Sequence, residues 1–250
     1  MKLTVPPPNI NITSASLLIK MQNDPFVAKF LEKENNSVLD IGCGLPDQLW
    51  DLYHDVGIRN LSGIDRETEN QIIEHSLEVK WKTIIPDEKK ESLKTIFDLY
   101  KHYTVVADPS TFELRPPILA LEEYNERFNI QFESEWLYET QFHPESFDYL
   151  VLSNAIHLNV DLNGNQSTQQ YRTKNFFNMA VNTLKKGGLI FIRVPHQNAT
   201  NTDPLKHIRF NEDNFFEFIG DKFKEIHFEV ESDKIKNIEK NSLLFLGVKK

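Results

Sequence analysis

Short apolar runs and helical stripes of apolar residues alternate along much of this 250-residue chain. Four runs are bounded by polar residues: Ser37–Ile41, Asn60–Asp65, Phe147–Ala155 and Gly187–Pro195. The last two runs are apolar over most of their length, which is typical of strands that are buried on both faces of a sheet. The four runs therefore predict the central strands of a parallel sheet.

Three segments show apolar residues at helical spacing. Asp24 and Pro25 predict the N-cap and first residue of a short amphipathic helix before the first strand. A stripe from Leu49 to Val56 predicts a helix that is closed by Gly57.

The third stripe runs from Phe176 to Leu184 and predicts a helix between the last two strands. Its last turn would carry Lys185 and Lys186, and it would stop at Gly187. Since strands and helices alternate, the pattern predicts an α/β fold with a doubly wound, mostly parallel sheet.

The end of the chain has a different pattern. Residues 224–232 alternate between apolar and polar, residues 242–250 form another strand-like run, and the segment 233–241 between them is polar. This arrangement predicts a C-terminal antiparallel hairpin at the sheet edge, with 233–241 as its loop.

The length of the chain favours a single domain over 1–250 with two additions. Residues 1–23, which include three consecutive prolines, are expected to form an N-terminal arm. Residues 78–128 exceed what one crossover needs and carry two helical stripes, which predicts a helical insertion. The insertion could consist of packing helices, or it could form a lid or substrate wall over the carboxyl edge of the sheet.

The acidic composition limits the partners that we expect. The chain has 28 basic and 37 acidic residues, a formal net charge of −9, and its short lysine runs are interleaved with acids. Such a surface repels polyanions, so no nucleic-acid partner is expected.

The single cysteine and the absence of long apolar segments suggest where the protein is located. Cys43 alone can form neither an intramolecular disulfide nor an all-cysteine zinc site, and no metal site is expected. The sequence has no apolar leader and no window of about 18 apolar residues. We therefore expect a cytoplasmic protein without membrane contact.

A glycine turn follows the first strand, and its flanking acids distinguish it from a dinucleotide site. Gly42 and Gly44 fit the first two glycines of G-x-G-x-x-G, but Asp47 occupies the third position and Asp40 ends the strand. At ~5 Å and an effective dielectric of ~20, each carboxylate would oppose a phosphate charge by roughly 3 kcal/mol. A nicotinamide-dependent oxidoreductase is therefore disfavoured, and a ligand with an ammonium group suits Asp40 better.

Asp65 follows the second strand, 21 positions after Gly44. An acid about 20 residues beyond the glycine turn is placed to accept hydrogen bonds from both ribose hydroxyls. The combined pattern predicts a site for a nucleoside that carries an ammonium group and no diphosphate.

At these residues the chain resembles the class I S-adenosylmethionine-dependent methyltransferases. The motifs that carry the resemblance are VLDIGCG, GID, ESFDYLVLSNAIHL and LKKGGLIFIRVP, and they cover somewhat less than half of the chain. The resemblance implies a methyltransferase-like domain with a seven-stranded sheet, parallel except for its last strand, and S-adenosylmethionine as cofactor.

The resemblance also implies cofactor contacts. Asp40, Gly42 and Gly44 would surround the methionine part, with Cys43 at a variable position that is more typical of a buried filler. Asp65 would hold the ribose, with Arg66 beside it. The list of expected contacts is completed by Glu135 or Trp136, near the adenine, and by Asn154.

His157 is the candidate general base, because imidazole exchanges protons near neutral pH, and His196 is a weaker candidate. Relatives that methylate exocyclic amines of bases or of glutamine typically carry an Asn/Asp-Pro-Pro-aromatic signature at Asn154, where this chain has SNAI. The expected function is therefore methyl transfer to a small-molecule acceptor. The alternative is a non-catalytic, S-adenosylmethionine-binding methyltransferase-like subunit.

Overall fold

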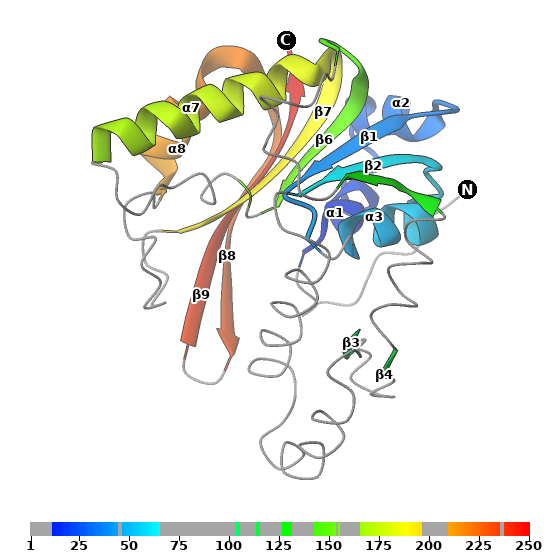
Figure 1. Cartoon of the computed structure of the whole chain (residues 1–250), viewed down its shortest axis with the longest axis horizontal. Helices are drawn as coiled ribbons and strands as arrows, with labels where there is room; N and C mark the ends of the chain where they lie inside the picture. The colour runs from blue at the N-terminus through cyan, green and yellow to red at the C-terminus, as the bar shows by residue number, and fades with distance from the viewer. Residues whose placement is uncertain are drawn as a thin grey trace.

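The computed structural model describes residues 12–44, 47–65, 104–105, 114–115, 127–131, 143–153, 155, 166–196, 210–235 and 238–250. Its centre is a seven-stranded sheet of order β5-β2-β1-β6-β7-β9-β8 (Figure 1). The strands are β1 (Ser37–Ile41), β2 (Asn60–Ile64), β5 (Asn129–Gln131), β6 (Phe147–Ser153), β7 (Leu184–Pro195), β8 (Phe223–Ile235) and β9 (Ile238–Lys249).

The direction of the strands divides the sheet into two parts. β5, β2, β1, β6 and β7 pair in parallel, whereas β9 pairs antiparallel with both β7 and β8. The predicted sheet with a C-terminal antiparallel hairpin is thus confirmed. In a parallel sheet all carboxyl ends meet at one edge, and ligands of doubly wound folds bind there.

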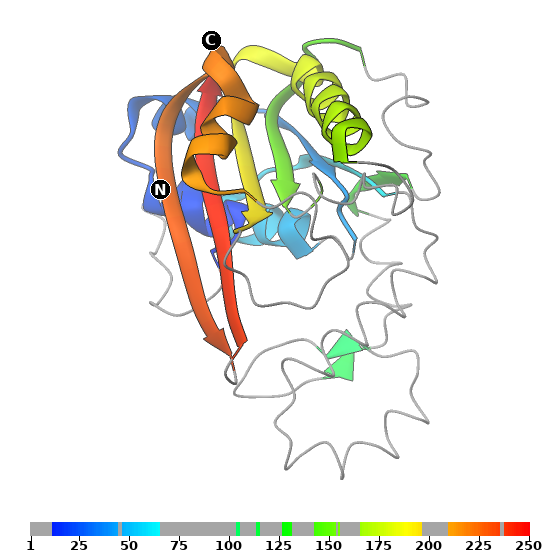
Figure 2. The ribbon, with the colours of Figure 1, turned by 90° about the vertical axis from the view of Figure 1, so that its left-hand side faces the viewer.

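Helices cover both faces of the sheet (Figures 1 and 2). One face packs against α1 (Ser14–Lys20), α2 (Pro25–Glu32) and α3 (Asp47–Asp51), which continues into a π-helical turn, η1 (Leu52–Val56). The other face packs against α7 (Gln166–Thr183) and α8 (Glu212–Ile219), which a 3₁₀ turn, η3 (Gly220–Lys222), joins to β8. Successive strand residues therefore contribute alternately to two separate apolar cores.

The predicted caps of two helices are confirmed. Asp24 caps α2, with its side chain accepting from the backbone N–H of Phe26, and Pro25 is the first helical residue. Gly57 closes η1 in the left-handed conformation, with φ 86°.

The prediction that the next helix reaches Gly187 was wrong. α7 ends at Thr183, and Leu184 already pairs with Phe147 of β6. The carbonyls of Asn182 and Thr183 accept from the backbone of the loop before β6, so the last turn is satisfied four residues earlier than predicted.

Two other elements differ from the predictions. Part of the expected N-terminal arm is the helix α1, which begins with a capping box between Thr13 and Ser16. The expected hairpin loop at 233–241 is mostly strand, because β8 and β9 pair as far as Ile235 and Ile238. Figures 1 and 2 show this hairpin extending beyond the carboxyl ends of β6 and β7.

Most of the expected helical insertion at 78–128 lies outside the described residues. Within it, β3 (Thr104–Val105) and β4 (Leu114–Arg115) pair as a short antiparallel ladder, which was not predicted. Among the described helices, none combines the length and apolarity that crossing a membrane requires.

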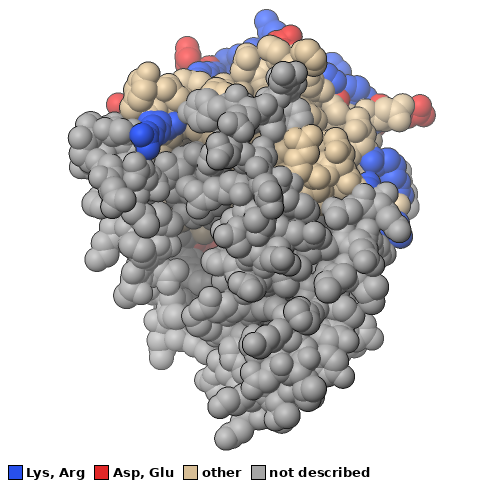
Figure 3. Space-filling view, viewed as in Figure 1, with Lys and Arg blue, Asp and Glu red and all other residues tan. Residues whose placement is uncertain are grey.

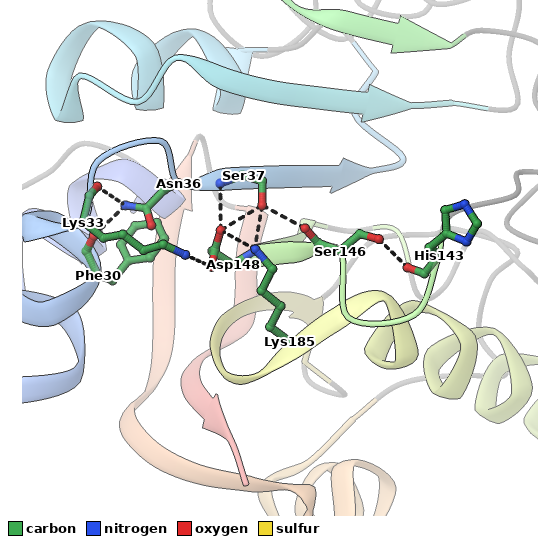
Figure 4. A network of polar contacts seen from close by, with 8 residues as sticks. All are labelled: Phe30, Lys33, Asn36, Ser37, His143, Ser146, Asp148 and Lys185. Atoms are coloured by element: carbon green, nitrogen blue, oxygen red, sulfur yellow. Dashed lines mark hydrogen bonds and ion pairs between the residues drawn. The ribbon is translucent and has the colours of Figure 1, made fainter.

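A polar cluster around Asp148 fixes the amino edge of the sheet (Figure 4). Its carboxylate accepts hydrogen bonds from Lys33 at the end of α2, from the backbone N–H of Ser37 at 3.1 Å and from Lys185 at 3.0 Å. Burial alone would raise the pKa of Asp148, but these donors outweigh burial and lower the pKa to about 2. The cluster joins β1, β6, β7 and α2 at the edge opposite the glycine turn.

Candidate functional site

The glycine turn wraps around the end of β2. Gly42 and Gly44 have φ values of 70° and 53°, a left-handed conformation that favours glycine. The backbone N–H groups of Gly42 and Cys43 both donate to the carbonyl of Ile64, at 2.8 and 3.1 Å. The turn is therefore held against the neighbouring strand at the carboxyl edge of the sheet.

Gly63 is a third glycine that this turn requires, and the sequence analysis did not single it out. A Cβ at Gly63 would lie 2.9 Å from Cys43 Sγ and 3.2 Å from Leu49 Cδ1. Gly63 pairs with Asp40 across the ladder. Because Cys43 and Leu49 lie so close, only a residue without a side chain lets the turn and α3 approach β2 at this position. A glycine inside a strand pattern signals such an approach, and that signal was present in the sequence.

Asp65 is attached to the glycine turn. Its Oδ2 accepts a hydrogen bond from the backbone N–H of Gly44 at 2.8 Å, and its own N–H donates to the Gln131 carbonyl of β5 at 3.0 Å. The two acids that the sequence places on either side of the turn are close enough that the charge of Asp65 raises the pKa of Asp40. The structure thus brings Asp40, Asp65 and the two glycines together.

Asp40 is a buried carboxyl group without a described partner. Its side chain is 1% exposed, and neither oxygen accepts a hydrogen bond from any residue that the structure describes. Burial, and then the charge of Asp65, raise the pKa of Asp40 from 3.8 to about 8. Near neutral pH the ligand-free carboxyl group is therefore largely protonated.

The environment of Cys43 suits a packing residue. The thiol is buried, and burial followed by the charges of Asp40 and Asp65 raises its pKa well above the ordinary value. A thiol that stays protonated is a poor nucleophile, so Cys43 acts as the small filler between the turn and Gly63.

No family model matches the sequence, and no curated protein matches it. Solved structures do match this chain. A SAM-dependent methyltransferase from Methanosarcina mazei superposes with a TM-score of 0.51 at 15% identity, over 90% of this chain and 97% of that one. The methyltransferase domain of bacterial CtHen1-CN superposes with a TM-score of 0.50 at 11% identity, over 96% of this chain and 100% of that one.

The fold is that of the class I methyltransferases. This confirms the resemblance that the motifs indicate, as far as the fold is concerned. At these identities the likeness shows the fold alone. The ligand and the reaction must therefore be inferred from the residues of this chain.

Five of the predicted site residues lie outside the part of the chain that the structure describes: Arg66, Glu135, Trp136, Asn154 and His157. Their roles stay predictions. Among the residues that the structure does describe, no group of three or more His, Cys, Asp or Glu side chains could hold a metal ion.

His196, the weaker base candidate, lies at the end of β7 and is directed toward α8. It is buried, its backbone bridges to Phe210, and its Nε2 lies 3.8 Å from a carboxylate oxygen of Glu212. Nearby, Arg193 pairs with Glu231 of β8 at 2.8 Å. These contacts attach the end of β7 to the start of α8 and to β8.

Proposed function

We propose that the protein transfers a methyl group from S-adenosylmethionine to a small-molecule acceptor. The observation that carries this proposal is the carboxyl group of Asp40, which is buried beside the glycine turn without a described hydrogen-bond partner. Leaving such a group unsatisfied costs about 1–3 kcal/mol, or more when it is charged. A ligand ammonium would remove that cost and favour the ionised carboxylate.

The other described residues of the turn fit the same ligand. Asp65 is positioned by Gly44 at the end of β2, where a carboxylate can accept from both ribose hydroxyls. The left-handed glycines let the backbone approach a ligand without side chains in the way. Together these residues suit a nucleoside at Asp65 and a cationic amino-acid end at Asp40.

When bound, S-adenosylmethionine supplies a methyl group on a sulfonium, which needs mainly an aligned nucleophile and sometimes a base. The chain's contribution is to orient the two ends of the cofactor through Asp40 and Asp65. His157 stays our candidate for removing a proton from the acceptor, because it comes shortly after the end of β6 in the sequence.

The proposal of a small-molecule acceptor is supported by the charge of the chain and by the SNAI sequence at Asn154. Figure 3 shows both basic and acidic side chains on the described part of the visible face. A formal net charge of −9 opposes the binding of a polyanion. The cytoplasmic location remains a prediction from composition.

A labelled-methyl assay tests the proposed activity. The protein is incubated with methyl-labelled S-adenosylmethionine and a cell extract that has been separated by size into small-molecule and macromolecular fractions. We expect label in a product of the small-molecule fraction. Label in protein or nucleic acid would contradict the acceptor class.

The same assay addresses the alternative of a non-catalytic subunit. If S-adenosylhomocysteine binds with micromolar affinity but no fraction accepts label, the protein binds the cofactor without transferring the methyl group. The Asp65→Ala variant serves as the control, because weakened cofactor binding should reduce label transfer by roughly the same factor at limiting cofactor.

A further inference from the structure

Asp40 faces the helical layer that contains α1. Side chains alternate along a strand, so Asp40 shares a face with Val38. Val38 packs in the same apolar core as Ala15 and Leu17 of α1 and Tyr149 of β6. The buried carboxyl group therefore lies on the side of the sheet that α1 covers, not on the side of α7 and α8.

Ser14, the first residue of α1, carries a second buried polar group in this layer. Its side chain is 0% exposed, and its hydroxyl makes no hydrogen bond within the described part of the chain. A hydroxyl buried without a partner costs about 1–3 kcal/mol. A ligand atom could form the missing hydrogen bond to the Ser14 hydroxyl, as it could to the carboxyl group of Asp40.

Two contacts direct Ser14 toward the glycine turn. Its backbone N–H donates to Gln48 Oε1 at 2.8 Å, and Gln48 lies in α3, the helix that the glycine turn leads into. Its carbonyl accepts a long hydrogen bond of 3.5 Å from the hydroxyl of Tyr149. Burial, and to a lesser extent the charge of Asp40, raise the pKa of that phenol, so Tyr149 bonds to Ser14 and is also close enough to Asp40 to be affected by its charge.

Additional contacts hold α1 to the C-terminal hairpin. Just before the helix, the backbone N–H of Ile12 donates to Glu231 at 3.2 Å. At its other end, Lys20 pairs with Glu229 at 3.1 Å. Glu231 also pairs with Arg193 of β7. The position of Ser14 is thus fixed by α3, β6 and β8, although α1 is only seven residues long.

We propose that the Ser14 hydroxyl binds the amino-acid end of S-adenosylmethionine together with Asp40, so that α1 is part of the cofactor site. A serine hydroxyl can donate to the ligand's carboxylate or accept from its ammonium, and either bond would satisfy the buried oxygen. This inference rests on the proposed function, since it assigns a further contact to the same ligand.

Two nucleoside thioethers test the inference by calorimetry. S-adenosylhomocysteine has the amino-acid end, and 5′-methylthioadenosine has the same nucleoside without it. We expect Ser14→Ala to weaken S-adenosylhomocysteine binding roughly 10-fold or more, as for a hydrogen bond to a charged group. Binding of 5′-methylthioadenosine should change less than 2-fold.

Thr173→Val is the matched control. Thr173 is 1% exposed, and its hydroxyl also lacks a hydrogen-bond partner among the described residues, but it belongs to α7 on the opposite face of the sheet. The control should bind both ligands like the wild type. Ser14→Cys fills the space of the serine with a weaker hydrogen-bonding group and should weaken binding in the same way as Ser14→Ala. It serves as the test variant where Ser14→Ala folds poorly.

The outcomes separate the two proposals. If the wild type binds S-adenosylhomocysteine and the Ser14 variants bind both ligands like the wild type, Ser14 is not a cofactor contact. Equal weakening of both ligands also overturns the inference, because it indicates a general disturbance of α1. If the wild type binds neither ligand, the proposed function fails as well.

Discussion

At the scale of single residues, the two acids of the glycine turn differ in how the protein accommodates them. Asp65 accepts a backbone hydrogen bond from Gly44, whereas Asp40 is buried without a described donor. A buried acid in this situation keeps its proton until a cation arrives. Ligand binding and the ionisation of Asp40 should consequently be coupled.

Proton release on binding measures this coupling. At pH 7 the ligand-free Asp40, with its pKa raised to about 8, is mostly protonated, and an ammonium beside it favours the carboxylate. Binding of S-adenosylhomocysteine at pH 7 should therefore release close to one proton. Calorimetry in buffers with different ionisation enthalpies measures the number directly.

The control for this prediction is Asp40→Asn, for which the Asp40-linked release should disappear. In the ligand-free wild type, the same raised pKa means that stability falls as the pH rises from about 4 to about 8, since unfolded Asp40 ionises at its ordinary pKa of 3.8. An equal proton release by both proteins would contradict the role given to Asp40.

Asp65→Ala should weaken nucleoside binding by roughly 10-fold or more, because hydrogen bonds to a charged group contribute about 1.5–3 kcal/mol. Unlike the Ser14 variants, it should weaken S-adenosylhomocysteine and 5′-methylthioadenosine equally, since both carry the ribose. A dissociation constant that stays at the wild-type value would argue against the ribose assignment.

At the scale of elements, the turn, β2 and α3 pack so closely at Gly63 that a methyl group does not fit. Gly63→Ala would place a Cβ 2.9 Å from Cys43 Sγ and 3.2 Å from Leu49 Cδ1. We expect a loss of about 1–3 kcal/mol in the free energy of unfolding, measured by urea denaturation. Adding Cys43→Ala should recover part of this loss, because it removes the nearest atom and leaves Leu49.

Fully additive effects of the two substitutions would mean that Cys43 and Gly63 are not in contact. Cys43→Ala alone serves as the reference, and it should leave S-adenosylhomocysteine binding largely unchanged, because the thiol is a packing group.

The cluster around Asp148 stabilises the opposite edge of the sheet. The pKa of Asp148 is lowered to about 2. The stability that the cluster contributes is therefore fully present above the ordinary pKa of 3.8 and is lost as the pH falls toward 2. After discounting for solvent around Lys33 and Lys185, we expect Asp148→Asn to cost about 1–2 kcal/mol at pH 7.

Denaturation of wild type and Asp148→Asn across pH 2–7 checks this prediction. The difference between the two proteins should shrink below pH 4, while ligand affinity at pH 7 stays the same, because the cluster lies away from the glycine turn. A difference that does not depend on pH would indicate lost packing and not lost charge interactions.

The elements that the sequence predicted well are those in which burial enforces a pattern. The runs of β1, β2, β6 and β7 are buried on both faces, so composition marks them. Among the described strands, the tips of β8 and β9 extend past the others and pair only with each other, so no apolar pattern marks residues 233–240. The early end of α7 depends on partners in the loop before β6, which local sequence does not reveal.

At the scale of the whole molecule, the site is assembled from segments far apart in the chain. The motifs predicted Asp40, the glycines and Asp65, because these lie at fixed spacing along one β-α-β segment. Ser14 and Gln48 could not be predicted, since their relation to Asp40 depends on how α1 docks against α3 and β6. The helix α1 and the hairpin are held together by Glu229 and Glu231, so α1 and β8 are in contact although they lie far apart in the sequence.

The central claim is that the site binds a cationic amino-acid nucleoside and rejects a diphosphate. Titration calorimetry of the wild-type protein at pH 7 with S-adenosylhomocysteine and, separately, with NAD tests it most directly. We expect micromolar binding of S-adenosylhomocysteine and binding of NAD at least roughly 100-fold weaker, because NAD brings no ammonium to Asp40 and its diphosphate would lie beside the acid Asp65. Equal or tighter binding of NAD would contradict it.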